Sequence, residues 1–153
     1  MTDYNMLREQ IRELIRTDSW FVPAMSNISA LLMETLPDLN WAGFYVLRNG
    51  RLVVGPFQGK PACIHIPEGK GVCGTALQED RALNVPDVHA FPGHIACDSA
   101  SKSELVIPLH ADRKAVAVLD MDSPRTSRFT AKDEEELKKA MEMMENLLNW
   151  DGI

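Results

Sequence analysis

The dipeptide Asn49-Gly50 separates two apolar segments, NWAGFYVL at residues 40–47 and RLVVGPF at residues 51–57. An Asn-Gly pair in this position is the strongest short-range signal of a β-hairpin, because both residues tolerate the positive φ angles of a type I′ turn. The two segments are therefore predicted to be neighbouring antiparallel strands. This constrains the fold class, since a hairpin does not fit the alternating strand-helix order of a parallel α/β sheet.

Helical patterns lie on both sides of these strands. Residues 3–16 carry apolar side chains at helical spacing, and a second helix is predicted to begin near Pro23 and to end before Pro37. The last helix is predicted to begin at Thr130, which resembles a capping box with Asp133 three residues later. Its apolar stripe contains Leu137, Ala140, Met141, Met144, Leu147 and Leu148.

The middle of the chain adds shorter elements. Strands are predicted at 62–66, 82–85, 104–109 and 115–123, a short helix at 71–80, and a loop at 86–104. The last two strands form a second predicted hairpin, so the centre of the sheet is expected to be antiparallel. We therefore expect an α+β fold in a single domain over residues 1–153, a length that suits one ordinary hydrophobic core.

The charge and the apolar pattern exclude several partners. A net charge of −6 argues against nucleic-acid binding, which needs a basic surface. No apolar run approaches the roughly 20 residues of a membrane span, and the first residues lack the pattern of a signal peptide. We therefore expect a cytoplasmic protein. Its three cysteines are then expected to be free thiols that bind metal, carry out redox chemistry or are simply buried.

The segment GKGVCG at residues 69–74 matches the pattern G-x-G-x-x-G. A dinucleotide site needs this pattern in a βαβ unit of a parallel sheet, which the predicted hairpins contradict. We expect instead a turn that begins a short helix. Cys73 would then lie near the helix N-terminus, where the dipole favours a thiolate, although burial as a small apolar side chain is an equal alternative.

Cys97 has more polar neighbours, because the segment GHIACDSASKSE surrounds it with glycine, histidine, aspartate and serine. This predicts a loop that solvent can reach. A zinc site could combine Cys63, Cys73 and Cys97. His65 or His94 could complete it, although structural zinc sites usually have more closely paired ligands than this spacing gives.

Two carboxylates in the segment LDMD share one face of a strand. Side chains alternate along a strand, so Asp120 and Asp122 are expected to point the same way. Charges this close raise the pKa of at least one carboxyl group, which suits cation binding or proton donation. Glu104 could join them if its strand pairs with theirs. The alternative is a solvated strand end without a function.

Trp41 and Tyr45 are four residues apart and therefore share a strand face with Gly43. Large rings beside a glycine are expected to leave a groove. Such a groove could hold a small apolar or cationic group, and ordinary core packing is the alternative.

Four segments together resemble the free methionine-(R)-sulfoxide reductases, a family of GAF-domain enzymes. They are WAGFY, GKPACIHIPEGKGVCGTA, DVHAFPGHIACDSASKSELVIPL and VLDMDSP, between about residues 40 and 124. The resemblance implies a GAF fold with a central antiparallel sheet, the N- and C-terminal helices on one face and a ligand pocket on the other. It also implies a cytosolic homodimer that needs no metal or organic cofactor.

The resemblance further implies roles for individual residues. Cys97 matches the family's nucleophile, Cys63 its usual resolving thiol, and Cys73 either an auxiliary or a direct participant. The implied substrate pocket contains Trp41, Tyr45, Glu104, Asp120 and Asp122.

The implied chemistry is attack of Cys97 on the sulfoxide sulfur, with Glu104 as the expected proton donor. Cys63 would convert the resulting sulfenic acid to a disulfide, which thioredoxin would reduce. Two other functions stay open. One is a GAF sensor that binds a ligand without turnover, and the other is a zinc-binding regulatory module.

Overall fold

The computed structural model describes residues 1–95, 97 and 99–153. These residues form a six-stranded sheet in the order β3-β2-β1-β6-β5-β4, and each strand is antiparallel to its neighbours. The predicted antiparallel arrangement is therefore confirmed. The strands are β1 (Trp41–Arg48), β2 (Arg51–Gly59), β3 (His65–Pro67), β4 (Leu83–Val85), β5 (Ser103–Ala111) and β6 (Lys114–Ser123).

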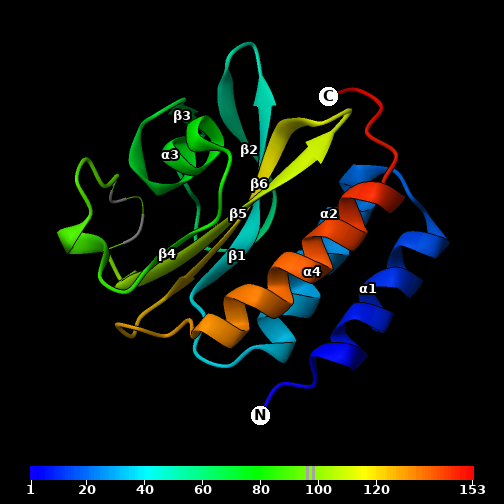
Figure 1. The fold of residues 1–153 in the computed structure, drawn as a ribbon, viewed down its shortest axis with the longest axis horizontal. Helices are drawn as coiled ribbons and strands as arrows, with labels where there is room; N and C mark the ends of the chain where they lie inside the picture. Colours follow the sequence, from blue (N-terminus) through cyan, green and yellow to red (C-terminus); the bar gives the residue numbers. More distant parts are fainter. Residues whose placement is uncertain (96, 98) are drawn as a thin grey trace.

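The helices divide between the two faces of the sheet (Figure 1). One layer packs on one face and consists of α1 (Tyr4–Thr17), α2 (Phe21–Thr35) and α4 (Ala131–Leu147). The short helix α3 (Gly71–Glu79) packs against β5 and β6 from the other face. The N- and C-terminal helices thus share one face, as expected, and the opposite face is left for a pocket. No helix among the described residues is long and apolar enough to span a membrane.

Alternation along β6 separates two apolar clusters. Ala117, Leu119 and Met121 belong to the cluster that packs beneath α1, α2 and α4. Val118 belongs to the cluster on the α3 side, where Asp120 also lies. The predicted alternation is therefore confirmed, and it directs the carboxylate of Asp120 away from the larger core.

The β1–β2 hairpin has the predicted turn. Asn49 and Gly50 both have positive φ angles, 53° and 80°, and Arg48 pairs with Arg51 across the turn. This backbone conformation matches the right-handed twist of the two strands, which is why Asn-Gly is favoured there. The hairpin fixes the position of Trp41 and Tyr45 at the centre of the sheet.

Helices α4 and α2 begin at or near the residues that the sequence predicted. Thr130 and Asp133 form the predicted capping box at the start of α4. Helix α2 begins at Phe21, two residues before Pro23. The proline lies in the first turn, where its missing N–H is not needed for an intrahelical bond.

Two predicted segments differ from the structure. The strand predicted at 62–66 is observed only as His65–Pro67, and Cys63 lies outside it, disulfide-bonded to Cys97. The segment 86–104, predicted as a loop, contains a short 3₁₀ helix at Val88–Ala90, and β5 already begins at Ser103. The side chain of Asp87 accepts a hydrogen bond from the backbone N–H of His89, which explains where this 3₁₀ turn begins.

Candidate active site

A small cavity of about 50 Å³ lies on the α3 face of the sheet, opposite the helical layer. Strands β5 and β6 supply its carboxylates and β1 supplies two aromatic rings. Pro61, Ala62, His94, Ile95 and Cys97 also line it. All five residues predicted for the substrate pocket line it. The full lining is Trp41, Tyr45, Pro61, Ala62, Ile66, Cys73, His94, Ile95, Cys97, Ser101, Glu104, Asp120 and Asp122.

Two of the three cysteines are joined at the edge of this cavity. Cys63 and Cys97 form a disulfide, with their Cα atoms 5.6 Å apart and a separation of 34 positions in sequence. Both are half-buried, and Cys97 lines the cavity. The spacing of the cysteines in the sequence could not show that these two thiols lie close enough to form a bond. Only the family resemblance indicated this pair. A Cys–His zinc site that uses all three thiols is incompatible with this state.

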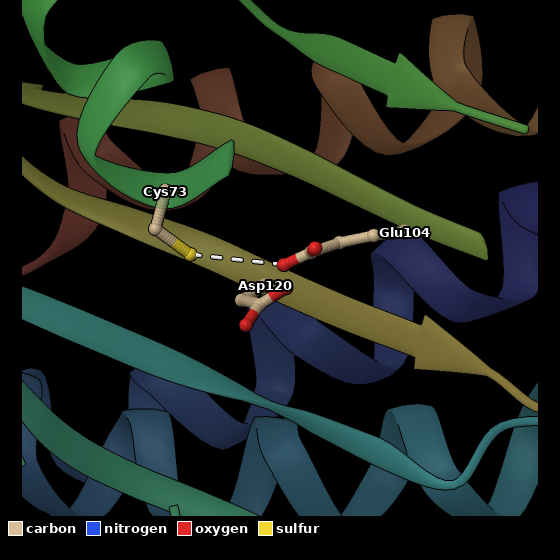
Figure 2. Close-up of side chains that lie close together, drawn as sticks. All are labelled: Cys73, Glu104 and Asp120. Atoms are coloured by element: carbon tan, nitrogen blue, oxygen red, sulfur yellow. Dashed lines mark hydrogen bonds between the residues drawn. The ribbon is translucent and has the colours of Figure 1, made fainter. Parts of the chain in front are cut away.

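Cys73 is the remaining thiol and lies in the first turn of α3. Its side chain is only 3% exposed, and its thiol donates a weak hydrogen bond to Oε2 of Glu104 over 3.9 Å (Figure 2). Burial first, and then the neighbouring charges of Asp120 and Glu104, raise the pKa of Cys73 well above 9.0. The predicted thiolate at this helix terminus is therefore wrong, because burial beside carboxylates outweighs the helix dipole.

The glycines of GKGVCG bring α3 close to the sheet and do not form a nucleotide-binding loop. Gly71 has a φ angle of +63°, which a side chain would strain. A Cβ on Gly74 would lie 2.4 Å from the backbone oxygen of Pro67. The predicted turn and short helix are confirmed, and the close approach places the thiol of Cys73 over the sheet.

Strand pairing gathers the three carboxylates. Glu104 on β5 lies directly opposite Asp122 on β6, and Val106 lies opposite Asp120. Glu104 and Asp120 are 7% and 6% exposed, and Oδ1 of Asp120 has no hydrogen-bond partner among the described residues. The prediction that Glu104 joins the carboxylates of LDMD is confirmed as a matter of geometry.

The environment favours the neutral form of these acids. Burial, followed by the charges of Asp120 and Asp122, raises the pKa of Glu104 well above 4.5. Burial also raises the pKa of Asp120 above 3.8. Because several negative charges cannot share this site at low cost, the cluster holds a proton that could be given to a bound oxygen atom.

An aromatic wall stands beside the carboxylates. The rings of Trp41 and Tyr45 stack with centroids 5.8 Å apart, and Phe57 stacks on the same indole at 5.0 Å. The hydroxyl of Tyr45 donates to the carbonyl oxygen of Cys63 over 3.2 Å, so one wall residue also holds the disulfide segment. Burial and the charge of Asp120 raise the pKa of Tyr45 far above its usual range, so the hydroxyl keeps its proton.

The prediction of a groove beside Gly43 is wrong. A Cβ on this glycine would lie 2.2 Å from Cβ of Phe57, its partner across the strand pair, so the aromatic residue fills the space. Sequence reasoning did not assign Phe57 to the site. The regular register of the predicted hairpin would pair Gly43 with Pro56, and an irregularity between Gly43 and Tyr45 brings Phe57 opposite the glycine, so the sequence did not indicate this pair.

Six of the lining residues were not assigned to the pocket from the sequence. They are Pro61, Ala62, Ile66, His94, Ile95 and Ser101, of which His94 was considered only as a zinc ligand. Burial, with the charge of His89 as a second cause, lowers the pKa of His94 below 6.5, which favours a neutral ring. His94, Ile95 and Ser101 lie outside helices and strands, where no periodic pattern indicates which side chains point inward.

The family model for the GAF domain matches residues 6–148. The free methionine-R-sulfoxide reductase of Escherichia coli is 47% identical to this chain over 95% of its length and 88% of the bacterial protein. The chain belongs to the free methionine-R-sulfoxide reductase family of GAF domains.

Solved structures of this reductase family match the fold closely. The fRMsr of Staphylococcus aureus, solved in complex with substrate, superposes with a TM-score of 0.92 at 48% identity over 97% of both chains. The free methionine-R-sulfoxide reductase of Neisseria meningitidis, in complex with its substrate, gives 0.90 at 37% identity over 94% of this chain and 87% of that one. The expected GAF fold is therefore confirmed.

Proposed function

We propose that this protein reduces free methionine-(R)-sulfoxide to methionine, with its own thiols as the electron source. The observation that carries the proposal is one cavity that holds the disulfide-forming Cys97, an aromatic wall and a buried carboxylate cluster. Family relatives named for this activity support the substrate class and the R configuration.

The proposed reaction begins at Cys97. Its thiolate attacks the sulfoxide sulfur while Glu104 donates a proton to the sulfoxide oxygen. In the S–S-bonded intermediate that results, the protonated oxygen moves from the methionine sulfur to Sγ of Cys97. The S–S and S–O bonds of the intermediate break, methionine leaves, and Cys97 becomes a sulfenic acid. The thiol of Cys63 then displaces water and forms the disulfide, so two thiols are oxidised for each sulfoxide reduced.

The rest of the cavity is proposed to hold the amino acid. The carboxylates of Asp120 and Asp122 bind its ammonium group, and the methylthio end lies against Trp41, since sulfur packs well on aromatic rings. A methionine-sulfoxide residue within a protein has no free ammonium group. Binding it would leave the buried acids without their cation, which is costly, so we expect selectivity for the free amino acid.

The disulfide must be reduced before the next turnover. We propose that a dithiol protein of the thioredoxin class does this by thiol–disulfide exchange in the cytoplasm, and that the working protein is a homodimer. The exchange begins at Cys63, because Cys97 lines the cavity whereas Ile64, next to Cys63, is 60% exposed. Attack there releases Cys97 as a thiolate that already lines the substrate cavity.

A single-turnover experiment tests this proposal. Reduced protein receives one equivalent of the R sulfoxide, and methionine release and cysteine oxidation are followed by mass spectrometry. We expect one methionine and one Cys63–Cys97 disulfide from the wild type, a trapped sulfenic acid on Cys97 in Cys63→Ser, and no methionine from Cys97→Ser. Cys73→Ser is the matched control and should still form the disulfide. Binding of the sulfoxide without methionine release from the wild type would favour the ligand sensor instead.

A further inference from the structure

The buried cluster under α3 contains three potential metal ligands that come from separate elements. Cys73 lies on α3, Glu104 on β5 and Asp120 on β6. One donor atom from each lies within 4.8 Å of the other two, and all three residues are buried (Figure 2). The close-up shows the thiol and the carboxyl groups turned toward the same small region. A modest contraction would give the spacing of ligands around one tetrahedral ion.

A second observation concerns Asp120 itself. Its side chain is 6% exposed, and its Oδ1 atom is buried without a hydrogen-bond partner among the described residues. A buried carboxylate oxygen without a partner is costly, and native structures rarely tolerate one without a reason. A bound cation would satisfy this oxygen.

We propose that Cys73, Glu104 and Asp120 form a binding site for one thiophilic divalent cation, of the Zn²⁺ or Cd²⁺ class. The set of one sulfur and two oxygen ligands favours such ions over Mg²⁺ or Ca²⁺, which prefer oxygen alone. Three protein ligands leave a further position for water, as in many open zinc sites. The thiol and both carboxyl groups line the cavity, so the ion has a route of entry.

The cation would occupy the space that the substrate needs. The same carboxylates are proposed to hold the ammonium group and the proton for the reductase reaction, so ion and amino acid cannot bind together. The ion therefore acts as an inhibitor and not as a cofactor. Metal binding itself does not rest on the proposed function, because it is measured without turnover.

Cadmium titration tests the site directly. Oxidised wild-type protein is suited to it, because the Cys63–Cys97 disulfide leaves Cys73 as the one free thiol of the three cysteines. We expect thiolate-to-cadmium absorption in the ultraviolet that saturates at one equivalent. A Cys63→Ser/Cys97→Ser double variant should behave in the same way, and it shows whether the disulfide restricts entry.

Single substitutions of the two carboxylates test whether these side chains bind the cadmium ion. Glu104→Gln and Asp120→Asn keep the side-chain shape and should weaken cadmium binding by at least about tenfold, the loss that even indirect partners of a metal site cause. The matched control is Asp112→Asn in the exposed β5–β6 turn, which should bind as the wild type does. Circular dichroism checks that each variant is folded.

Three results would overturn the inference. The first is that neither the folded wild type nor the folded double variant shows cadmium–thiolate absorption at one equivalent of cadmium. The second is absorption that both carboxylate variants leave undiminished. The third, failure of free methionine sulfoxide to displace cadmium from a Cys63→Ser/Cys97→Ser double variant that does bind the sulfoxide, would refute mutual exclusion. None of these depends on catalysis, so the reductase proposal fails or stands by its own experiment.

Discussion

Glu104 combines burial with two acidic neighbours. It lies opposite Asp122 in the β5–β6 ladder and accepts the weak hydrogen bond from Cys73. The neutral acid is favoured because the charged form would lose its hydration beside other negative charges. A neutral carboxyl group can donate a proton, which a carboxylate cannot do.

This protonation has a consequence for stability. Below about pH 4.5, the ordinary value for glutamic acid, Glu104 is protonated in both the folded and the unfolded chain. Above it, the unfolded chain loses this proton more readily than the folded one. The raised folded pKa therefore means that stability falls as pH rises through that folded pKa. We expect the urea midpoint of the wild type to fall more steeply over this range than that of Glu104→Gln.

Glu68→Gln is the control for this pH experiment, because Glu68 is exposed and lies outside the cavity. It should keep the pH dependence of the wild type. If the urea midpoints of Glu104→Gln and the wild type fell equally steeply with pH, Glu104 would ionise in the folded protein as it does in the unfolded chain.

At the scale of elements, helix α3 places Cys73 over the carboxylates. The helix approaches the β3 segment so closely that only glycine fits at position 74. The clash of an added Cβ is with the backbone oxygen of Pro67, so a side-chain rotation cannot relieve it.

Gly74→Ala should therefore move α3 or destabilise the fold by about 1–3 kcal/mol, the usual cost of overpacking. Urea unfolding measures the loss, and alkylation of Cys73 in the folded protein should become faster. Gln78→Ala, on the exposed side of the same helix, should change stability by less than about 0.5 kcal/mol. A wild-type midpoint for Gly74→Ala would contradict the close packing of this helix.

The elements with a clear period or turn were predictable from the sequence. Asn49-Gly50 gave the central hairpin, and strand alternation placed Asp120 and Asp122 on one face. The partner of Cys97 was not predictable from spacing, because a link across 34 residues depends on tertiary structure. The protonation of Cys73 was also beyond the sequence, since burial decides it and the helix dipole does not.

At the scale of the whole molecule, the sheet separates a structural face from a chemical face. The helical layer of α1, α2 and α4 lies on one side and α3 lies on the other (Figure 1). The larger apolar cluster lies beneath the helical layer, and the cavity with Cys97 and the acid cluster lies on the α3 side. The disulfide ties the chain before α3 to the segment that leads into β5. Its two redox states should therefore differ in global stability.

We expect the oxidised protein to be more stable than the reduced protein by about 3 kcal/mol, because the bond restricts a long loop in the unfolded chain. Urea unfolding with and without a dithiol reductant measures the difference. The Cys63→Ser/Cys97→Ser double variant is the control and should not respond to the reductant. Identical midpoints for oxidised and reduced wild type would contradict a disulfide that constrains the fold.

The most direct test of the proposed function is steady-state turnover of the free amino acid sulfoxides. Free methionine-(R)-sulfoxide and free methionine-(S)-sulfoxide are supplied separately, and NADPH oxidation is followed through thioredoxin reductase and thioredoxin. We expect turnover of the R form only, and its loss in Cys97→Ser. Absence of turnover with either form, from folded wild-type protein with three free thiols, would contradict the reductase assignment.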